Sequence, residues 1–437
     1  MNTVESKAIF WHRRDLRIND NAGLFKALKK VDKIYPIFIF DSAILEKIPK
    51  NDQRVIFIYN SIKELKSDYN KKGVDLLVYF GDPKVLIPSL SLELNVSSVY
   101  TNNDYEPNAI KRDLFVYNEL AKINISFIGA KDHVIFEKNE IVKGDNSPYT
   151  VFTPYMKKWK EKLNDFYLKS YPSENKMLKI NPIKEFSELP TLEQIGFSDV
   201  QNQSFPSRSC SNQILTEYAA NRDYPELEAT SKLGLHLRFG TISIRELARE
   251  SSFLSTVYLN ELIWRDFYQM IIYQFPYSEK SAFKKKYDLI TWDNNEVFFN
   301  KWCEGKTGYP IVDAGMRELN STGFMHNRVR MIVASFLTKH LLIDWKWGET
   351  YFAEKLLDYD LASNVGGWQW AASSGCDASP YFRVFNPTLQ QQKFDKEFKY
   401  IKKWVKEFGT SEYPEPIIEH SFARERVISL YKKTLAI

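Results

Sequence analysis

The stretch Leu357–Trp370, LDYDLASNVGGWQW, is the most informative part of this 437-residue chain. Two aspartates, an asparagine, a glycine pair and two tryptophans lie close together in it, a mixture that apolar helical periodicity alone does not require. A buried tryptophan needs a partner for its indole N–H, and a buried carboxylate is costly unless it is paired. We therefore expect this segment to surround a large aromatic, polar ligand instead of ordinary core.

Three upstream segments combine acidic, basic and aromatic residues in a similar way. They are Tyr258–Tyr268 (YLNELIWRDFY), Gly305–Ala314 (GKTGYPIVDA) and Asn320–Met331 (NSTGFMHNRVRM). In their order and spacing, the four segments resemble the flavin domain of the photolyase/cryptochrome family, most closely its class I cyclobutane pyrimidine dimer (CPD) photolyases. The resemblance runs from about Tyr218 to Gln390, with a weaker match at Trp11–Arg17.

The composition is that of a globular protein with room for two or more domains. Aromatic residues make up 15% of the chain, including 10 Trp and 25 Tyr, which is typical either of a large aromatic core or of surfaces that stack on a flavin and on bases. The net charge is only +5, so charge alone does not identify a nucleic-acid binder, although folding can still assemble a basic patch.

The cysteines and the N-terminus indicate in which cellular compartment the protein is expected. Cys210, Cys303 and Cys376 are isolated, and an odd count without ligand spacing argues against a disulfide framework and against a metal site. The N-terminus lacks the apolar core of a signal peptide, and no apolar run is long enough to span a membrane. We expect a soluble, cytoplasmic protein.

The first part of the chain alternates strand and helix patterns. The expected strands are Ala8–His12, Ile34–Phe40, Asp75–Phe80, Ser98–Asn102 and Ile125–Ile128, and the helical patterns are near Ala22–Lys30, Arg54–Asn70, Pro83–Leu94 and Ala109–Lys122. This alternation predicts an α/β domain, a Rossmann-like doubly wound parallel sheet with helices on both faces. The dinucleotide fingerprint G-x-G-x-x-G is absent from the sequence, so no dinucleotide site is expected in this domain.

The rest of the chain is predicted to be all-α. Residues of about 165–210 have little periodicity and indicate a long connector. Helical patterns follow at Ser211–Asn221, Val257–Phe275, Glu296–Cys303, Ile311–Asn320, Val329–Lys339, Glu349–Leu357 and Gln390–Phe408. We predict an α/β antenna-chromophore domain at 1–135, an interdomain connector at 136–210, and a helical FAD- and DNA-binding domain at 211–437.

Glu261, Trp264, Arg265 and Tyr268 are spaced to share one helical face. A mixed acid–aromatic–basic stripe suits a pocket lining, although a satisfied buried network would also explain it. The resemblance implies that Glu261 hydrogen-bonds the base carbonyls of the dimer, that Trp264 stacks against the lesion, and that Arg265 and Tyr268 complete the site. To meet a carbonyl, Glu261 must be protonated or surrounded by donors.

Asn327 and Met331 form a second pair on one helical face, beside Arg328. A helix-capping asparagine followed by a core methionine is the alternative explanation. The resemblance assigns Asn327 and Arg328 to substrate and DNA contact and Met331 to the lesion pocket. Relatives that repair (6-4) photoproducts have histidine at both pair positions, so Asn327 and Met331 favour CPD repair. His326 is expected to be structural.

The Leu357–Trp370 segment, together with Arg330, is expected to contact the flavin. The resemblance pairs Arg330 with Asp358, places Tyr359 at the cofactor, sets Asp360 at the edge of the flavin ring, and brings the Asn364 amide to flavin N5. A reduced, anionic flavin requires donors and positive charge near its pyrimidine ring. Acids that complement a helix N-terminus would explain either aspartate singly, but not the whole cluster.

A hydroxyl-rich loop is the expected phosphate site. It consists of Thr230, Ser231, Lys232, Leu233 and Gly234, and the resemblance places the FAD pyrophosphate there, with Tyr218 and Tyr258 also at the cofactor. Such loops are often only turns. Two positions depart from the family pattern: Lys232 stands where arginine is expected, and Tyr258 where tryptophan is common. Lysine lacks the fork of arginine, so phosphate geometry is expected to loosen.

Two further sets complete the predicted site. Trp368, Trp345 and Trp292 match the family's electron-transfer chain from flavin to surface, which photoreduces oxidised FAD; core packing is the alternative for each one singly. Trp370, Arg222 and Gln390 match positions that contact DNA and the lesion. Trp370 lies two residues after Trp368 and would therefore face another side of the same helix.

The resemblance implies light-dependent repair of cyclobutane pyrimidine dimers in UV-damaged DNA. An electron would pass from excited reduced FAD to a flipped-out dimer, which makes the enzyme a deoxyribodipyrimidine photo-lyase. The alternative is a cryptochrome-like blue-light photoreceptor that binds the same flavin and does not repair DNA. No motif in the sequence supports a third possibility, an unrelated flavin oxidoreductase. We expect a monomer without an obligate protein partner.

An antenna chromophore is also expected, in the α/β domain. Glu106 follows a predicted strand and matches a glutamate that contacts folate in relatives that use methenyltetrahydrofolate. Other folate contacts, expected near Pro276–Lys284, do not align clearly, so methenyltetrahydrofolate, a deazaflavin, FMN or another second flavin, and no antenna at all stay open. An acid at a helix N-terminus explains Glu106 equally well.

Overall fold

The computed structural model describes residues 5–176, 185–198 and 204–436. The chain divides into two compact units, each assembled from three stretches of sequence. The first, which we call the sheet unit, comprises Met1–Glu140, Trp159–Cys210 and Lys232–Phe253, and the second, the helical unit, comprises Ile141–Lys158, Ser211–Ser231 and Leu254–Ile437. The domain boundaries predicted from the sequence stay predictions.

The sheet unit contains one sheet of five parallel strands in the order β3-β2-β1-β4-β5. The strands are β1 (Lys7–His12), β2 (Lys33–Asp41), β3 (Leu77–Gly81), β4 (Ser98–Asn102) and β5 (Ser126–Ala130). The helices assigned to this unit are α1 (Ala22–Leu28), α2 (Ser42–Leu45), α3 (Gln53–Asn70), α4 (Pro83–Glu93), α5 (Pro107–Lys122), α7 (Asp165–Leu168), α8 (Ser173–Lys176), α11 (Gly234–Phe239) and α12 (Ile244–Leu254). All five predicted strands and the doubly wound parallel architecture are confirmed.

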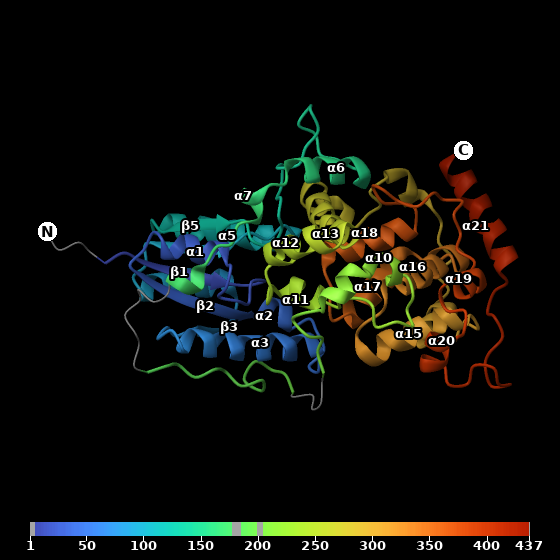
Figure 1. The fold of residues 1–437 in the computed structure, drawn as a ribbon, viewed down its shortest axis with the longest axis horizontal. Helices are drawn as coiled ribbons and strands as arrows, with labels where there is room; N and C mark the ends of the chain where they lie inside the picture. Colours follow the sequence, from blue (N-terminus) through green and yellow to red (C-terminus); the bar gives the residue numbers. More distant parts are fainter. Residues whose placement is uncertain (1–4, 177–184, 199–203, 437) are drawn as a thin grey trace. The chain divides into compact units, whose positions relative to one another are not determined.

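Helices cover both faces of the sheet (Figure 1). Alternate residues of β1 point to opposite faces: Ala8 and Phe10 pack in a core with α1 and α3, whereas Ile9 and Trp11 pack with α4 and α5. The order of strands reverses at β1, which pairs with both β2 and β4. The carboxyl ends of β1 and β4 therefore form the switch point at which ligands bind in open parallel sheets.

Part of the predicted connector is packed structure. Residues 165–176 contain two short helices, α7 and α8. Leu192, Ile195 and Phe197 are buried in the core of the sheet unit, together with side chains of α1 and α3. The lack of periodicity in this region reflects a chain that contributes single apolar side chains to a core without forming long regular elements.

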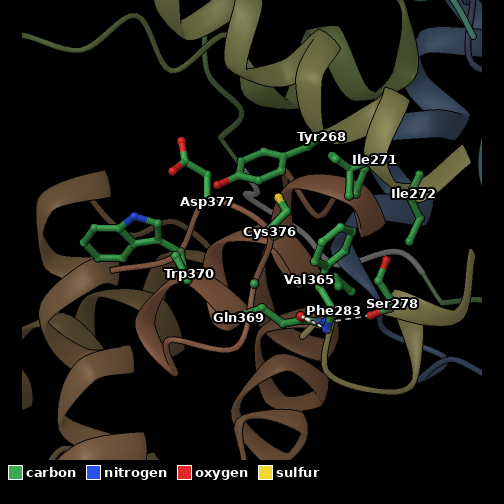
Figure 2. Close-up of a pocket in the computed structure, with 14 residues that line it drawn as sticks. Tyr268, Ile271, Ile272, Ser278, Phe283, Val365, Gln369, Trp370, Cys376 and Asp377 are labelled. Carbon is green, nitrogen blue, oxygen red and sulfur yellow. Dashed lines mark hydrogen bonds between the residues drawn. The ribbon is translucent and has the colours of Figure 1, made fainter. Parts of the chain in front are cut away.

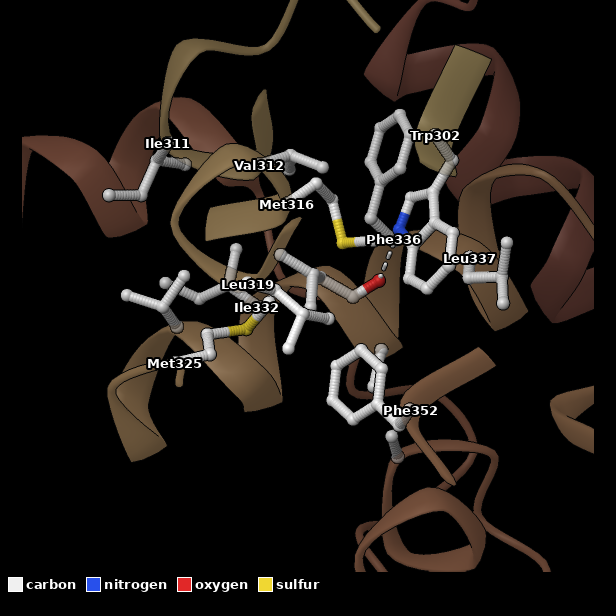
Figure 3. Close-up of a cluster of buried hydrophobic side chains, with 14 of the residues drawn as sticks. Trp302, Ile311, Val312, Met316, Leu319, Met325, Ile332, Phe336, Leu337 and Phe352 are labelled. Atoms are coloured by element: carbon white, nitrogen blue, oxygen red, sulfur yellow. Dashed lines mark hydrogen bonds between the residues drawn. The ribbon is translucent and has the colours of Figure 1, made fainter. Parts of the chain in front are cut away.

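The helical unit is built around one large apolar core (Figure 3). Its helices are α9 (Asn212–Thr216), α10 (Tyr218–Asn221), α13 (Thr256–Gln274), α14 (Glu296–Glu304), α15 (Pro310–Thr322), α16 (Asn327–Ser335), α17 (Trp345–Lys355), α18 (Leu361–Ala371), α19 (Pro387–Phe394), α20 (Lys399–Trp404) and α21 (His420–Leu435), with 3-10 turns η2 (Pro276–Glu279) and η3 (Lys285–Leu289) and a π-helical turn η4 (Phe336–His340); α6 (Phe152–Lys162) begins in this unit. Trp302, at the centre, satisfies its indole N–H on the Val333 carbonyl at 3.1 Å. The predicted helical character of this part of the chain is confirmed.

Three predicted helices are wrong in their extent. The predicted Ser211–Asn221 helix is interrupted at Glu217 and forms two short helices, α9 and α10. The predicted Gln390–Phe408 helix is two helices, α19 and α20, because the Asp395 carboxylate accepts the backbone N–H groups of Tyr400 and Ile401 at 3.1 and 3.0 Å and so starts a new helix. The predicted Val329–Lys339 helix leaves α-helical geometry after Ser335 and continues as the π-helical turn η4.

Candidate functional site

The predicted stripe on α13 is partly exposed, whereas its neighbours in the middle of the helix are buried. Glu261, Trp264, Arg265 and Tyr268 keep some solvent exposure, whereas Leu262, Ile263, Asp266, Phe267 and Gln269 are buried. Ser255 caps the helix by accepting the Tyr258 N–H at 3.3 Å. The four chemically distinct side chains therefore face a space that is open to a ligand.

Glu261 is paired with Arg222, another predicted site residue. Arg222 Nη1 donates to Glu261 Oε1 at 2.5 Å, and the same guanidinium lies 5.1 Å from the centre of the Tyr218 ring. Burial raises the pKa of Glu261 above its usual value, against the opposing effect of Arg222. Burial also raises the pKa of Tyr218, to about 12. The Glu261 carboxyl group therefore holds a proton more firmly than an exposed glutamate does.

Arg328 organises the neighbouring part of the site. Its Nη2 donates to Asp223 Oδ1 at 2.7 Å, its Nη1 lies 3.9 Å from the Met331 sulfur, and its guanidinium stacks on Phe394 at 4.5 Å. Asn327 is exposed at the first position of α16. The predicted residues Asn327, Arg328 and Met331 therefore share the start of one helix.

The structural role expected for His326 is confirmed. His326, and not Asn327, is the N-cap of α16, because its Nδ1 accepts the Arg328 N–H at 3.2 Å. Asn327 is consequently not needed as a cap, and its exposed amide is available to a ligand.

The predicted flavin contacts lie on α16, the α17–α18 connection and α18. Arg330 Nη2 donates to both carboxylate oxygens of Asp358, at 2.9 and 3.1 Å. Asp360 caps α18 by accepting the Ser363 N–H at 3.1 Å, and it also accepts both contacts of the buried Gln269 amide, at 3.0 and 3.1 Å. Asp360 therefore caps α18 and is held in place by the Gln269 amide at the same time.

Glu349 fixes two of the predicted cofactor residues, although sequence reasoning missed it. Asn364 Nδ2 donates to the Glu349 carbonyl at 3.0 Å and to its carboxylate at 2.9 Å, and Tyr359 hydrogen-bonds to the same carboxyl group. Both amide protons of Asn364 are thereby used, which leaves its Oδ1 for a ligand. Burial raises the pKa of Glu349, opposed by the Asn364 amide.

The space beside Asn364 suits a flat ligand. A methyl group added at Gly367 would meet no atom within 4 Å, and Gly367 lies three residues after Asn364, on the same side of α18. At Gly366, by contrast, the added atom would lie 2.3 Å from the Tyr268 ring, because α13 and α18 pack closely there. The backbone of α18 is therefore open at Gly367 and closely packed at Gly366.

The predicted phosphate loop divides between the two compact units. Thr230 and Ser231 belong to the helical unit, where both are partly buried and the Ser231 hydroxyl lies 2.9 Å from the Tyr258 hydroxyl. Tyr258 also meets the Tyr218 ring edge-on, with the ring centres 5.0 Å apart. Lys232, Leu233 and Gly234 belong to the sheet unit, with Lys232 in the left-handed region (φ 52°) and Leu233 as the N-cap of α11.

The predicted electron-transfer tryptophans belong to the helical unit and differ in exposure. Trp368 and Trp345 are buried in its core, and Trp292 is partly buried against it. Trp368 packs so tightly on α17 that a methyl group at Gly348 would lie 2.1 Å from the indole ring. Exposure thus increases only at Trp292, as a route from the interior to the surface requires.

A small, largely apolar pocket opens between α13, α18 and the loop after α18 (Figure 2). Trp370, Tyr268 and Gly366 line it, together with Cys376 and Asp377 from the loop. Trp370 also lies 6.2 Å from the centre of the Phe385 ring. Gln390 lies on α19 and is partly buried.

Glu106 lies at the switch point of the sheet unit, immediately before α5. Its Oε1 accepts from Arg14 Nη1 at 2.8 Å and from Arg238 Nη1 at 2.5 Å, and Arg14 also reaches Asp104 at 3.3 Å. The side chain of Glu106 makes no capping hydrogen bond to α5. Two guanidinium groups, and not the helix N-terminus, therefore hold this carboxylate; its predicted antenna role stays a prediction.

The described residues offer neither a cluster of metal ligands nor a membrane-spanning helix. No group of three or more His, Cys, Asp and Glu side chains is placed to hold a metal ion in residues 5–176, 185–198 and 204–436. Within those same ranges, the helices are too short or too polar to cross a membrane.

Known proteins resemble this chain along nearly its whole length. A family model described as DNA photolyase matches residues 8–175, and one described as the FAD binding domain of DNA photolyase matches residues 258–411. The deoxyribodipyrimidine photo-lyase of Synechococcus sp. is 36% identical, over 98% of this chain and 97% of that protein.

Solved structures agree with these matches. A bacterial class III photolyase from Agrobacterium tumefaciens superposes with a TM-score of 0.88 at 29% identity, covering 100% of this chain and 99% of that one. The archaeal photolyase from Sulfolobus tokodaii with two FAD molecules gives 0.80 at 35% identity, over 98% and 100% of the two chains. A Synechocystis cryptochrome gives 0.81 at 25% identity, with the same coverage. The class I assignment stays a prediction, but the matched models and full-length relatives show that the chain belongs to the DNA photolyase family of FAD-binding DNA-repair enzymes.

Proposed function

We propose that this enzyme splits cyclobutane pyrimidine dimers in UV-damaged DNA, using blue light. The observation that carries the proposal is the partly exposed stripe on α13, where Glu261 has a raised pKa and lies one helical turn from the indole of Trp264. A carboxyl group that holds its proton can donate to a base carbonyl, and an adjacent indole offers a stacking surface for the base. Together these properties suit a flipped-out pyrimidine dimer better than undamaged, stacked DNA.

The other site residues support recognition of the lesion and its DNA. Arg222 and Arg328 are cations at the edges of the stripe, and contacts with phosphates depend little on sequence. We assign Trp370, Tyr268 and Met331 to the walls of the lesion pocket, and Asn327 and Gln390 to polar contacts with the substrate. Extrusion of a dimer is less costly than that of a normal base, because the lesion is already poorly stacked.

FAD, kept reduced and anionic, would supply the light-driven electron for ring opening and recover it afterwards, so that the reaction is a lyase reaction without net redox change. We assign its polar edge to Arg330, Asp358, Asp360 and Asn364. Glu349 holds the Asn364 amide so that its Oδ1 faces the ligand. Further contacts are assigned to Tyr218, Thr230, Ser231, Lys232, Leu233, Gly234, Tyr258, Arg265 and Tyr359.

Trp368, Trp345 and Trp292 are proposed as the route by which electrons from solution reach oxidised FAD. Trp368 and Trp345 are buried and Trp292, at the surface end of the route, is partly exposed, which supports this assignment. The route restores the reduced enzyme and is not part of repair itself. An antenna chromophore is assigned to the sheet unit, with Glu106 as one contact and its chemical identity left open among folate, deazaflavin and a second flavin. We further propose that the enzyme acts as a cytoplasmic monomer.

The decisive experiment exposes the reduced, FAD-loaded protein and a thymine-dimer oligonucleotide to blue light, with a parallel sample in darkness. Loss of the dimer only in light is the expected result. Glu261→Ala should retain FAD and lose most of the repair, since the partly exposed carboxyl group is assigned to the substrate and is not part of the core. If the wild-type protein binds and photoreduces FAD yet leaves the dimer intact, repair is excluded and a cryptochrome-like photoreceptor becomes the better explanation.

A further inference from the structure

Phe152 covers one face of the Trp264 indole. The two rings are stacked with centres 3.6 Å apart and planes only 6° from parallel. Phe152 itself is buried, with 8% of its surface exposed. Isolated aromatic pairs prefer larger offsets or edge-to-face geometry, so the surrounding structure must hold these rings in register.

Neighbouring groups on three segments provide that support. The Phe152 backbone N–H, at the first position of α6, donates to Asp377 Oδ2 at 2.9 Å. The Phe267 ring meets both stacked rings edge-on, at 5.9 Å from Phe152 and 5.6 Å from Trp264. Tyr155, one turn along α6, packs on Phe267 at 5.1 Å. The position of Phe152 is therefore fixed from its backbone and from its ring edge.

Asp377 connects this support to the other proposed lesion-binding tryptophan. It belongs to the loop after α18, seven residues beyond Trp370, and it lines the same pocket as Trp370 and Tyr268 (Figure 2). A carboxylate at the start of a helix is favoured by the unpaired N–H groups there. One hydrogen bond thus joins the pocket wall at Trp370 to the ring that backs Trp264.

We propose that Phe152 is a positioning residue for lesion recognition, and that Asp377 sets its place. With one face of Trp264 covered by Phe152, a base can stack only on the opposite face. Tyr268, tilted by 32° at 5.3 Å from Trp264, borders that indole as well. The inference rests on the proposed function, in which Trp264 stacks against the dimer. It adds Phe152 and its segment, where no site residue was predicted from the sequence.

The test compares dimer-containing and undamaged duplex DNA of the same sequence, using FAD-loaded protein. Phe152→Leu should weaken binding of the dimer about tenfold, because stacking on a loosened indole loses part of its strength. Binding of undamaged DNA, FAD content and FAD photoreduction should stay within about twofold of wild type. Phe152→Tyr retains the ring and should restore dimer affinity, which loss of general packing would not allow.

Asp377→Ala provides a second variant that leaves both rings intact. It should weaken dimer binding in the same selective way, and the double variant should be no weaker than Phe152→Leu alone, because both act through one contact. Phe408→Leu is the matched control: Phe408 packs on Phe398 and Tyr413 in the helical unit, outside the predicted site. Its dimer affinity should equal that of wild type.

Two results would overturn the inference while leaving the proposed function in place. One is a wild-type protein that repairs the dimer and a Phe152→Leu variant that binds it equally well. The other is an equal loss of affinity for damaged and undamaged DNA. If the wild-type protein does not discriminate the dimer at all, the proposed function fails first and the positioning role falls with it.

Discussion

Arg222 and Glu261 form a close ion pair, with Nη1 and Oε1 2.5 Å apart, at the open edge of the α13 stripe. The pair is partly exposed on both sides, so its contribution to stability is small after solvent screening. Its importance lies in the proton of Glu261. Burial raises the pKa of the carboxyl group and Arg222 lowers it, so the guanidinium controls how readily Glu261 becomes a donor.

Removing Arg222 should therefore shift the pH dependence of dimer binding. In Arg222→Ala, the opposing charge is gone and the pKa of Glu261 rises further. Lesion-specific binding that needs a protonated Glu261 should then persist to higher pH than in wild type, while affinity for all DNA falls because one phosphate contact is lost. Affinity for both DNAs, measured from pH 5 to 8, separates the two effects; an unchanged pH profile would contradict this role. Arg222→Lys, which keeps the charge, is the control.

The adjacent glycines Gly366 and Gly367 allow a matched comparison. Gly366→Ala places a methyl group 2.3 Å from the Tyr268 ring, and such overpacking should lower the free energy of unfolding by about 1 to 2 kcal/mol after the gain in helix propensity. Gly367→Ala meets no atom within 4 Å, so it should leave stability unchanged or raise it slightly. If FAD approaches α18 there, Gly367→Ala should nevertheless retain less FAD. Thermal unfolding and flavin absorbance measure both effects, and full FAD retention would place the flavin elsewhere.

The parts of the site that were predictable are those encoded by local spacing. Glu261, Trp264 and Tyr268 lie three or four residues apart, and that spacing determines the face of a helix whatever packs against it. The strands were equally predictable, because short β-branched runs between helical patterns are compatible with few other structures.

The contacts that were not predicted join elements that are distant in sequence, or elements whose packing cannot be inferred from a local sequence pattern. Glu349 reaches Asn364 from a different helix, Asp377 reaches Phe152 across 225 residues, and the Asp395 carboxylate interrupts an otherwise continuous helical pattern. Each depends on which elements pack together, a property of the tertiary structure. The start of α16 shows that even a local feature can be missed: a cap at Asn327 was the alternative explanation from the sequence, whereas the ring nitrogen of the preceding His326 takes that place.

Trp368 offers a test that separates photoreduction from repair. In Trp368→Phe, light-driven reduction of oxidised FAD should slow by about tenfold or more, because the first step of the proposed route is lost. Repair by chemically reduced protein should remain close to wild type. Trp347→Phe is the control, since Trp347 lies on α17 near Trp345 and packs on Phe299 but is not on the proposed route. Equal slowing in both variants would show that aromatic packing, not the route, limits photoreduction.

Because His326 is buried, the free energy of unfolding should fall measurably in acid. Burial, with the Arg330 charge, lowers its pKa to about 4, whereas an unfolded histidine titrates near ~6.5. The folded state therefore binds the proton less well, so the contribution to the free energy of unfolding is complete above ~6.5 and is lost as pH falls through about 4, by up to ~1.4 kcal/mol per pH unit. His326→Asn keeps a capping side chain on the Arg328 N–H but does not titrate. Denaturant unfolding at pH 7, 6 and 5 should show a shallower decline in the variant than in wild type. The other buried histidines contribute equally to both proteins, so identical slopes would mean that His326 is protonated as readily in the folded state as in the unfolded chain.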